Sequence, residues 1–244
     1  MSNMMNKVEQ SIFTFPARAY MRDDNFVVSS CNEAAFKAVE SWPNWLYFAL
    51  YLYGPTGCGK SHLATLFAQK VMAKKNNPYA VKIIKSEKIK RCSPEKMLSE
   101  SQCLIVDNLK ENVDNEALFH LYNYYRDNGG NILFLAEKAP KHINFKLPDL
   151  SSRMRAIPSI EIGAPNDEML QILLFKLFDD RQIKVAPEVL KYALNNMTRS
   201  FEYAQKLVAE ADRISFIKKS PITISTIKEA MELLDDNRQG DFFL

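Results

Sequence analysis

The feature that most constrains the fold is a glycine-rich loop that follows a short apolar run. From Tyr51 to Ser61 the chain reads YLYGPTGCGKS, which fits the pattern G-x-x-x-x-G-K-S without a mismatch. Successive backbone N–H groups can turn toward an anion only where side chains leave room, as glycines do. The preceding ALYLY is typical of a strand, and the following HLATLFAQKV has helical apolar spacing. This context favours a phosphate-binding loop over an ordinary strand-to-helix turn.

The loop predicts the cofactor and several of the residues that hold it. Lys60 is expected to reach the β- and γ-phosphates, and the Ser61 hydroxyl is expected to ligate Mg²⁺. The expected cofactors are therefore ADP or ATP together with Mg²⁺. The predicted nucleotide-binding residues of this stretch are Gly54, Pro55, Thr56, Gly57, Cys58, Gly59, Lys60, Ser61 and His62.

A second chemical element is CLIVDN, from Cys103 to Asn108. An apolar run that ends in aspartate predicts a buried central strand whose last carboxylate lies beside the loop, where Asp107 can hold Mg²⁺ through water. The alternative is a core strand that ends in a turn aspartate. Enzymes of this architecture that hydrolyse ATP usually have an acid at the next position, which orients or deprotonates the attacking water. The amide of Asn108 cannot take a proton, so slow hydrolysis by this chain alone is expected.

Strand-like and helix-like segments alternate from about residue 50 to residue 162. The segments 50–53, 80–85, 103–107, 131–136 and 159–163 predict strands, with helices after residue 60, near 93–99, at 115–126 and near 148–154. This alternation predicts an α/β fold with a five-stranded parallel sheet flanked by helices. Four amphipathic helices are then expected, at 167–180, 186–197, 200–219 and 223–236. The predicted domains are a tail at 1–16, an α/β domain at 17–164, a small all-helical domain at 165–237 and a tail at 238–244.

Composition narrows the class of protein. The 244 residues are 47% hydrophobic and 25% charged, which suffices for a large core. Neither an apolar run of roughly 18 to 20 residues nor the apolar core of a secretory signal is present, so a cytoplasmic protein without a membrane span is expected. A net charge of +3 is too small to argue nucleic-acid binding by itself. The scattered cysteines and histidines lack metal-ligand spacing, so reduced thiols and no zinc site are expected.

In this order, the motifs resemble those of the AAA+ ATPases, and within them the DnaA family and its short relatives of the Hda type. The stretch DDNFVVSSCNEAAFKAVE at 23–40 resembles the segment that leads into the DnaA AAA+ domain and packs against adenine, which implies nucleotide contacts from Asn25, Phe26 and Val27. LPDLSSRMRAIPSIEI resembles the arginine-finger region and puts Arg153 at the finger position, with a catalytic role. RSFEYA resembles the lid pattern R-E-L-E-G-A and puts Arg199 at the second sensor.

The departures from DnaA are also informative. DnaA continues after its lid into a helix-turn-helix domain that reads DNA, whereas this sequence stops soon after the last lid-like helix, so no sequence-specific DNA binding is expected. The pair Asp107 and Asn108, in place of the two acids of DnaA, is similar to the Hda type. Glu137 stands at the first-sensor strand, where the family more often has aspartate after a small polar residue.

A short N-terminal motif points to a protein partner. QSIFTF matches the form Q-x-x-Φ-x-F of peptides that bind the DNA sliding clamp, with Gln10, Phe13 and Phe15 as the expected contact residues. Such peptides bind as extended segments, because alternate side chains point the same way. Hda-type proteins are similar in carrying a clamp motif just before the AAA+ body. The alternatives are a chance match and an N-terminal strand docked on its own domain.

Together the motifs and the resemblance predict a nucleotide-gated regulator of chromosome replication initiation. Tethered to the sliding clamp, it would offer Arg153 to ATP-bound DnaA and promote hydrolysis there, while its own ATPase stays weak. The alternative is a DnaA-related helicase loader or remodeller that uses its own ATP cycle. A small-molecule P-loop kinase is a third reading, which leaves the helical domain unexplained. The sequence leaves open whether the chain forms a homo-oligomer.

Overall fold

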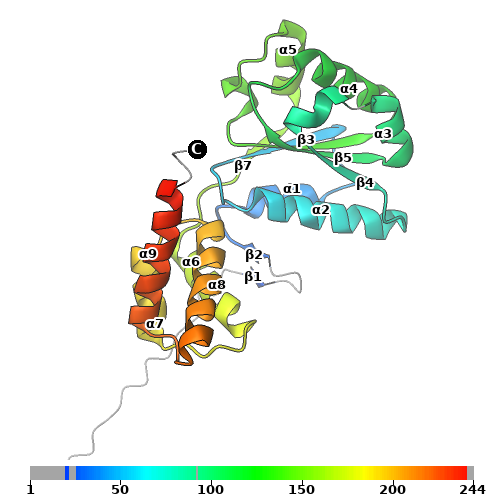
Figure 1. Cartoon of the computed structure of the whole chain (residues 1–244). Coiled ribbons are helices and arrows are strands. Elements are labelled where there is room, and N and C mark those ends of the chain that lie inside the picture. Colours follow the sequence, from blue (N-terminus) through cyan, green and yellow to red (C-terminus); the bar gives the residue numbers. More distant parts are fainter. Residues whose placement is uncertain (1–19, 22–25, 92, 241–244) are drawn as a thin grey trace, which may run out of the picture.

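A computed structural model describes residues 20–21, 26–91 and 93–240 (Figure 1). The clamp-type residues Gln10, Phe13 and Phe15, and the expected adenine contact Asn25, lie outside the described residues. The chain enters its ordered core through a short antiparallel pair, β1 (Tyr20–Met21) and β2 (Val27–Val28).

The centre of the described structure is a five-stranded parallel sheet with the order β4-β5-β6-β3-β7. Its inner strands are almost wholly buried because helices cover both faces, which explains their nearly continuous apolar sequences. The parallel arrangement puts the carboxyl ends of all five strands at one edge. The strands are β3 (Ala49–Tyr53), β4 (Val81–Lys85), β5 (Cys103–Leu109), β6 (Asn131–Ala136) and β7 (Ser159–Glu161).

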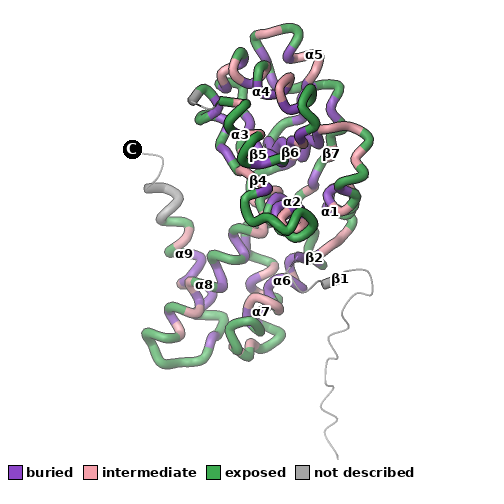
Figure 2. The backbone as a smooth tube through the Cα atoms, turned by 90° about the vertical axis from the view of Figure 1, so that its right-hand side faces the viewer, coloured by how far each residue is buried: buried purple, intermediate pink, exposed green. Residues whose placement is uncertain are grey.

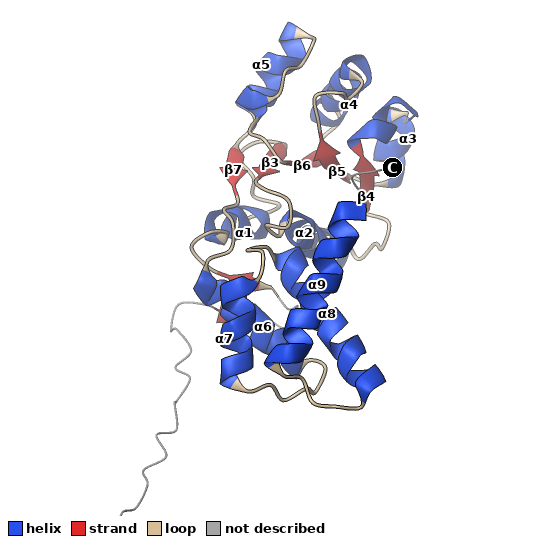
Figure 3. Ribbon diagram, turned by 60° about the vertical axis from the view of Figure 1, so that its left-hand side comes forward, coloured by secondary structure: helices blue, strands red, loops and turns tan. Residues whose placement is uncertain are grey.

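Helices cover the two faces of the sheet unequally (Figures 1 and 3). One face carries α1 (Glu33–Glu40) and α2 (Lys60–Lys75), which pack with Leu52 and Leu133 into one core. The other carries α3 (Pro94–Glu100), α4 (Asn115–Asp127) and α5 (Pro148–Ala156), which form a second core around Leu104 and Phe134. Short 3₁₀ turns, η1 (Ser86–Arg91) and η2 (Pro140–His142), connect these layers. The predicted α/β class with a five-stranded parallel sheet is confirmed.

Helix α1 was not expected from the sequence. It has only eight residues, and isolated helices of that length are marginal in water. Ala35, Phe36 and Val39 form its buried face, and Phe36 stacks on Phe26 with ring centroids 5.6 Å apart. Tertiary packing of its buried face therefore stabilises this helix, which its local sequence alone would not do.

After residue 166 the described chain is helical and has a hydrophobic core of its own, around Leu174, Leu207 and Ile227. Asn166 and Ser200 cap two of the helices, because their side-chain oxygens accept hydrogen bonds from the N–H groups of Met169 and Tyr203, at 2.9 and 3.0 Å. Helix α9 continues to Gly240, so the boundary expected at residue 237 falls inside a helix. The helices are α6 (Asp167–Asp179), α7 (Pro187–Asn196), α8 (Phe201–Lys218) and α9 (Ile224–Gly240).

Figure 2 shows the buried backbone gathered in the sheet layer and between the C-terminal helices. Over the described residues, no helix has both the length and the apolar character needed to cross a membrane.

Candidate nucleotide-binding site

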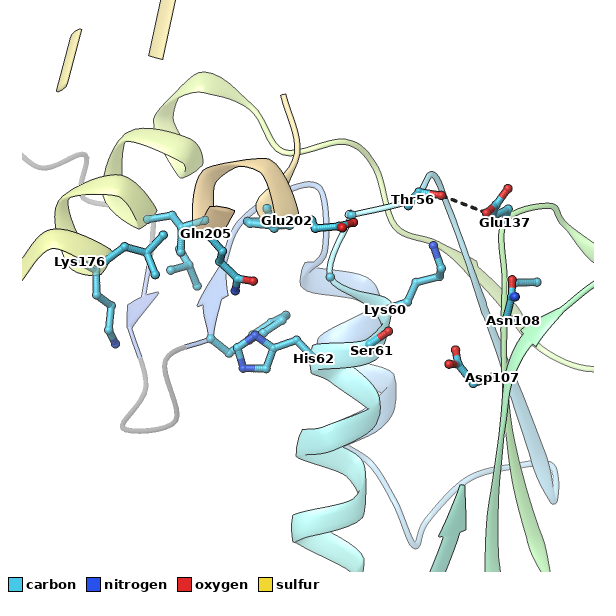
Figure 4. Close-up of a pocket in the computed structure, with 18 of the residues that line it drawn as sticks. Thr56, Lys60, Ser61, His62, Asp107, Asn108, Glu137, Lys176, Glu202 and Gln205 are labelled. Carbon is cyan, nitrogen blue, oxygen red and sulfur yellow. Dashed lines mark hydrogen bonds between the residues drawn. The ribbon is translucent and has the colours of Figure 1, made fainter. Parts of the chain in front are cut away.

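A cavity of about 720 Å³ lies between the carboxyl ends of the sheet strands and the helices α6 and α8 (Figure 4). In open parallel sheets, ligands bind outside the carboxyl ends of the strands. The volume is in the range of small-molecule and cofactor pockets. The lining residues are Phe26, Val27, Thr56, Gly57, Gly59, Lys60, Ser61, His62, Lys85, Asp107, Asn108, Ala136, Glu137, Leu173, Lys176, Leu177, Asp180, Phe201, Glu202 and Gln205.

The glycine-rich loop forms one end of the cavity and has backbone geometry that only glycine tolerates well. Gly57 has a φ of 74°, in the left-handed region, and a Cβ there would lie 2.9 Å from the Cβ of Ser200. A Cβ on Gly54 would lie 2.2 Å from the carbonyl oxygen of Ile162. The loop can therefore pack closely against the chain on both sides only because glycines occupy these two positions.

Helix α2 begins at Lys60, so its N-terminal N–H groups and the positive end of its dipole face the same space. The Lys60 ammonium donates hydrogen bonds to the carbonyl oxygens of Gly54 and Pro55, at 2.7 and 2.8 Å. The hydroxyl-bearing Ser61 is exposed in the first turn. This arrangement fits a polyphosphate, which offers oxygen acceptors to the ammonium and the helix N-terminus.

The cysteine inside the loop is a packing residue. The side chain of Cys58 is buried between the loop and the sheet. Burial raises the pKa of its thiol above the usual value, and the neighbouring Lys60 only partly opposes this shift. Cys58 therefore stays protonated near neutral pH, which makes it a poor nucleophile.

Asp107 and Asn108 lie near the end of β5, where the strand is irregular. Asp107 is half-buried and follows four fully buried residues, while Asn108 is exposed with a φ of 56°. The Ser86 hydroxyl donates to the Asn108 carbonyl oxygen at 2.7 Å, which fixes this turn of the backbone. Figure 4 shows both side chains on the same side of the cavity as Lys60 and Ser61.

The oxygen donors at this end fit a magnesium ion that is held mainly by a nucleotide. Mg²⁺ is usually bound by one or two protein oxygens together with phosphates and water, and Ser61 and Asp107 supply such oxygens. No group of three or more His, Cys, Asp or Glu side chains that could hold a metal by itself occurs among the described residues. The predicted metal ligands and the predicted phosphate loop are thus brought together.

Glu137, at the first-sensor position, also lines the cavity. Its carboxylate accepts a hydrogen bond from the Thr56 hydroxyl at 3.0 Å, which links the end of β6 to the phosphate loop. Figure 4 shows this bond beside Lys60. A second carboxylate therefore stands at the phosphate end, although the position after Asp107 lacks one.

The opposite end of the cavity suits a flat apolar ring. Phe26 and His62 meet edge to face with ring centroids 5.1 Å apart, and Val27 adjoins them. Leu177 of α6 and Phe201 of α8 also line the cavity, and Phe201 packs against the cluster that contains Val27. The sequence predicted Phe26, Val27 and His62 but missed the residues of α6 and α8, because the amphipathic pattern of a helix does not say which neighbour it covers.

Helix α8 touches the phosphate loop directly. The Phe201 N–H donates to the Gly57 carbonyl oxygen at 3.0 Å, and the Phe201 ring lies 3.6 Å from where a Cβ on Gly59 would be. Figure 4 shows Glu202 pointing toward the loop from the same helix. The C-terminal helices and the loop therefore form one continuous wall.

Arg199 lies outside the cavity lining, where the expected second-sensor role would place it inside. Its Nε and Nη2 atoms donate to the two carboxylate oxygens of Asp167 at 2.8 and 2.9 Å. These hydrogen bonds raise the pKa of the already permanently charged Arg199. Contact with a nucleotide stays a prediction, and it requires Arg199 to leave Asp167 at the start of α6.

Arg153 lies on α5, as expected, but its side chain folds onto its own chain. The guanidinium carbon is 4.3 Å from the centroid of the Phe119 ring on α4, a cation–π contact. Its Nη1 atom is buried and has no hydrogen-bond partner within the described part of the chain. Arg153 is not among the cavity residues, so the structure separates it from the residues around the phosphate loop.

Comparison with known proteins identifies the family of this chain. The family model of the bacterial DnaA ATPase domain matches residues 18–158. The replication initiator DnaA of Lacticaseibacillus paracasei is 26% identical over an alignment of 251 positions, gaps included, that covers 93% of this chain and 56% of that protein. The chain thus spans about half the length of this curated relative.

Solved structures agree on the fold. Domain III of DnaA from Thermotoga maritima is 23% identical with a TM-score of 0.76, over 87% of this chain and 95% of that one. AMPPCP-bound DnaA from Aquifex aeolicus is 21% identical with a TM-score of 0.67, over 79% and 65% of the two chains. At these identities the likeness establishes the fold, and the family follows from the match over residues 18–158. The chain belongs to the family of bacterial DnaA ATPase domains.

Proposed function

We propose that the cavity binds ADP or ATP together with Mg²⁺. The observation that supports this most directly is the convergence of the Gly54–Ser61 loop, the N-terminus of α2 and Asp107 on one end of a cavity whose other end is lined by Phe26 and His62. Phosphates fit the first end, and an adenine ring fits the second. The Aquifex aeolicus structure has AMPPCP, an ATP analogue, bound in a chain of the same fold.

We further propose that the protein regulates replication initiation by acting on DnaA. Asn108 cannot serve as a general base, so the bound nucleotide would be hydrolysed slowly. The nucleotide would then gate the activity of the protein instead of driving it by hydrolysis. Arg153 would act in trans on ATP-bound DnaA, since an arginine that reaches the γ-phosphate of a neighbour stabilises the charge that develops during phosphoryl transfer. The segment Gln10–Phe15 would hold the protein on the sliding clamp. The outcome would be ATP hydrolysis by DnaA and loss of its initiation competence.

For Arg153 to act in trans, its guanidinium has to leave Phe119. The cation–π contact is worth about 0.5 to 2 kcal/mol. Against this, the buried Nη1 atom has no acceptor in the described chain, and an unsatisfied buried donor costs about 1 to 3 kcal/mol. Phosphate oxygens of a neighbouring molecule would satisfy that donor. The cost of releasing Arg153 is therefore small enough for a partner to supply.

A second candidate is a helicase loader or remodeller that hydrolyses ATP itself. The observation that favours it is Glu137, a carboxylate at the phosphate end that could orient a water in place of the acid missing at position 108. This candidate predicts steady ATP turnover by the purified chain and no need for DnaA.

The test is hydrolysis of radiolabelled ATP preloaded on DnaA, in the presence of sliding clamp loaded on DNA. The parent protein is expected to accelerate hydrolysis, and Arg153→Ala to lose about 10³-fold or more of that acceleration. Arg155→Ala is the matched control, since Arg155 is an exposed arginine on the same helix and is expected to retain activity. Replacing Gln10, Phe13 and Phe15 together by alanine is expected to remove the part of the stimulation that requires the sliding clamp.

The outcomes separate the two candidates. Stimulation that survives Arg153→Ala would refute the finger assignment. No stimulation by the parent, combined with its own turnover above roughly one per second, would replace the regulator by the loader. Stimulation that is unchanged in the triple alanine variant would show that QSIFTF is not a clamp tether.

A further inference from the structure

Lys85 lines the cavity, yet none of the sequence motifs includes it. It is the last residue of β4, an edge strand of the sheet, and its register partner on β5 is Asp107. Paired residues of neighbouring strands direct their side chains to the same face of a sheet. Lys85 therefore stands directly beside the predicted magnesium ligand, on its outer side.

Within the described residues, the charge of Lys85 has no partner. Its ammonium makes no ion pair or hydrogen bond with any of the described residues, even with Asp107 next to it. Lys82, on the other face of the same strand, shows the contrast, because it pairs with Glu100 at 3.0 Å. An exposed lysine that lines a ligand cavity without a partner is available to an anion that enters there.

The orientation of a nucleotide in the cavity decides which of its phosphates lies near Lys85. An aromatic base fits between Phe26 and the helices, and the phosphates then run along the N-terminus of α2 toward Asp107. The phosphate farthest from the base therefore lies closest to the ends of β4 and β5. Lys60 is placed at the loop itself, where it can serve ADP and ATP alike, whereas Lys85 lies beyond it.

We propose that Lys85 binds the terminal phosphate of a nucleoside triphosphate and thereby makes the site distinguish triphosphate from diphosphate. This inference rests on the proposed nucleotide binding. With an amide at position 108 in place of an acid, the outer end of the cavity has one carboxylate fewer to repel the added phosphate. Lys85 thus lets the site discriminate between ATP and ADP without hydrolysing the nucleotide.

The test is calorimetric titration of the full chain with ADP and with the non-hydrolysable analogue AMPPCP, both with Mg²⁺. Lys85→Met is expected to weaken AMPPCP binding about tenfold and ADP binding by less than about twofold. Lys85→Arg, which keeps the charge, is expected to retain most of the preference. Lys176→Met is the matched control, because Lys176 also lines the cavity but points away from the phosphate loop in Figure 4; it is expected to leave the ratio of the two affinities unchanged.

Four outcomes would overturn the proposal. Equal weakening of ADP and AMPPCP would show that Lys85 acts on phosphates common to both, and unchanged affinities would show that it binds neither. Tighter binding of both with Mg²⁺, but not in EDTA, would show that Lys85 only competes with the metal at Asp107. If the wild-type protein bound neither nucleotide, the proposed cofactor would be refuted as well. The first three outcomes refute only the role of Lys85. Because Lys85 is exposed, thermal unfolding without nucleotide is expected to be the same for all variants, and Lys85→Gln provides a second variant if Lys85→Met differs.

Discussion

The two walls of the cavity are built on different principles. The sheet wall presents charges from the ends of strands and from the phosphate loop. Lys85, Asp107 and Glu137 lie at or next to a strand end, and Lys60 begins α2 directly after the loop. The helical wall presents mostly side-chain surface, such as Leu177 and Phe201, from helices whose main task is to close their own core. The sheet wall suits an anion of defined shape, and the helical wall suits a ring.

This difference predicts how much a substitution on each wall weakens nucleotide binding. A charge on the sheet wall faces a charged group of the ligand, and charge-assisted hydrogen bonds are worth about 1.5 to 3 kcal/mol each. The uncharged side chains of the helical wall, such as Leu177, Phe201 and Gln205, contribute apolar contact or one neutral hydrogen bond, which is worth less. Substitutions on the sheet wall are therefore expected to have the larger effects on affinity.

The largest effect is expected from Lys60→Ala. Loss of the ammonium that faces the phosphates should weaken both ADP and AMPPCP by at least about a hundredfold, as measured by calorimetry. Lys74→Ala, an exposed lysine in the last turn of the same helix, should bind both nucleotides like the parent. A loss of less than about threefold for Lys60→Ala would contradict the assignment of the loop.

An intermediate effect is expected where the two walls meet. Gly57→Ala adds a Cβ in the left-handed region and 2.9 Å from the Ser200 Cβ, so it should lower the free energy of unfolding by about 2 kcal/mol or more and weaken nucleotide binding. Gly129→Ala is a close control, because its φ of 71° is similar and nothing lies within 4 Å of its added Cβ. Urea unfolding of both variants separates backbone strain from the contact with α8. Equal destabilisation of the two would show that α8 does not press on the loop.

The smallest effect is expected from Gln205→Ala on the helical wall. Figure 4 shows Gln205 on the side of the cavity near His62, away from Lys60. Loss of one neutral hydrogen bond to the base should weaken ADP and AMPPCP alike by about two- to fivefold, in the same titrations. Gln171→Ala on α6, outside the cavity lining, should change neither affinity. An effect that differs between ADP and AMPPCP would place Gln205 near the phosphates and would erase the distinction between the walls.

Much of the sheet wall could be read from the sequence because its signals are local. The run ALYLY followed by GPTGCGKS encodes a strand, a glycine-rich turn and a helix start within a few residues, and the structure has β3, the loop and α2 at these places. The same holds for CLIVD, since an apolar run before an aspartate describes a buried strand, although β5 continues past Asp107 to Leu109. The four C-terminal helices were likewise predicted, because caps such as Asn166 and Ser200 act on neighbouring residues.

The remaining features depend on contacts between residues far apart in the sequence, and only the tertiary structure decided them. Strand pairing put Lys85 beside Asp107, and helix packing brought Phe201 onto Gly57. A sequence motif could mark Arg153 and Arg199 as candidate site residues, but it could not say that Arg153 lies on Phe119 and that Arg199 binds Asp167. Local patterns fix what an element is because they act within one turn or one strand, whereas the partner of a side chain depends on how all elements pack at once.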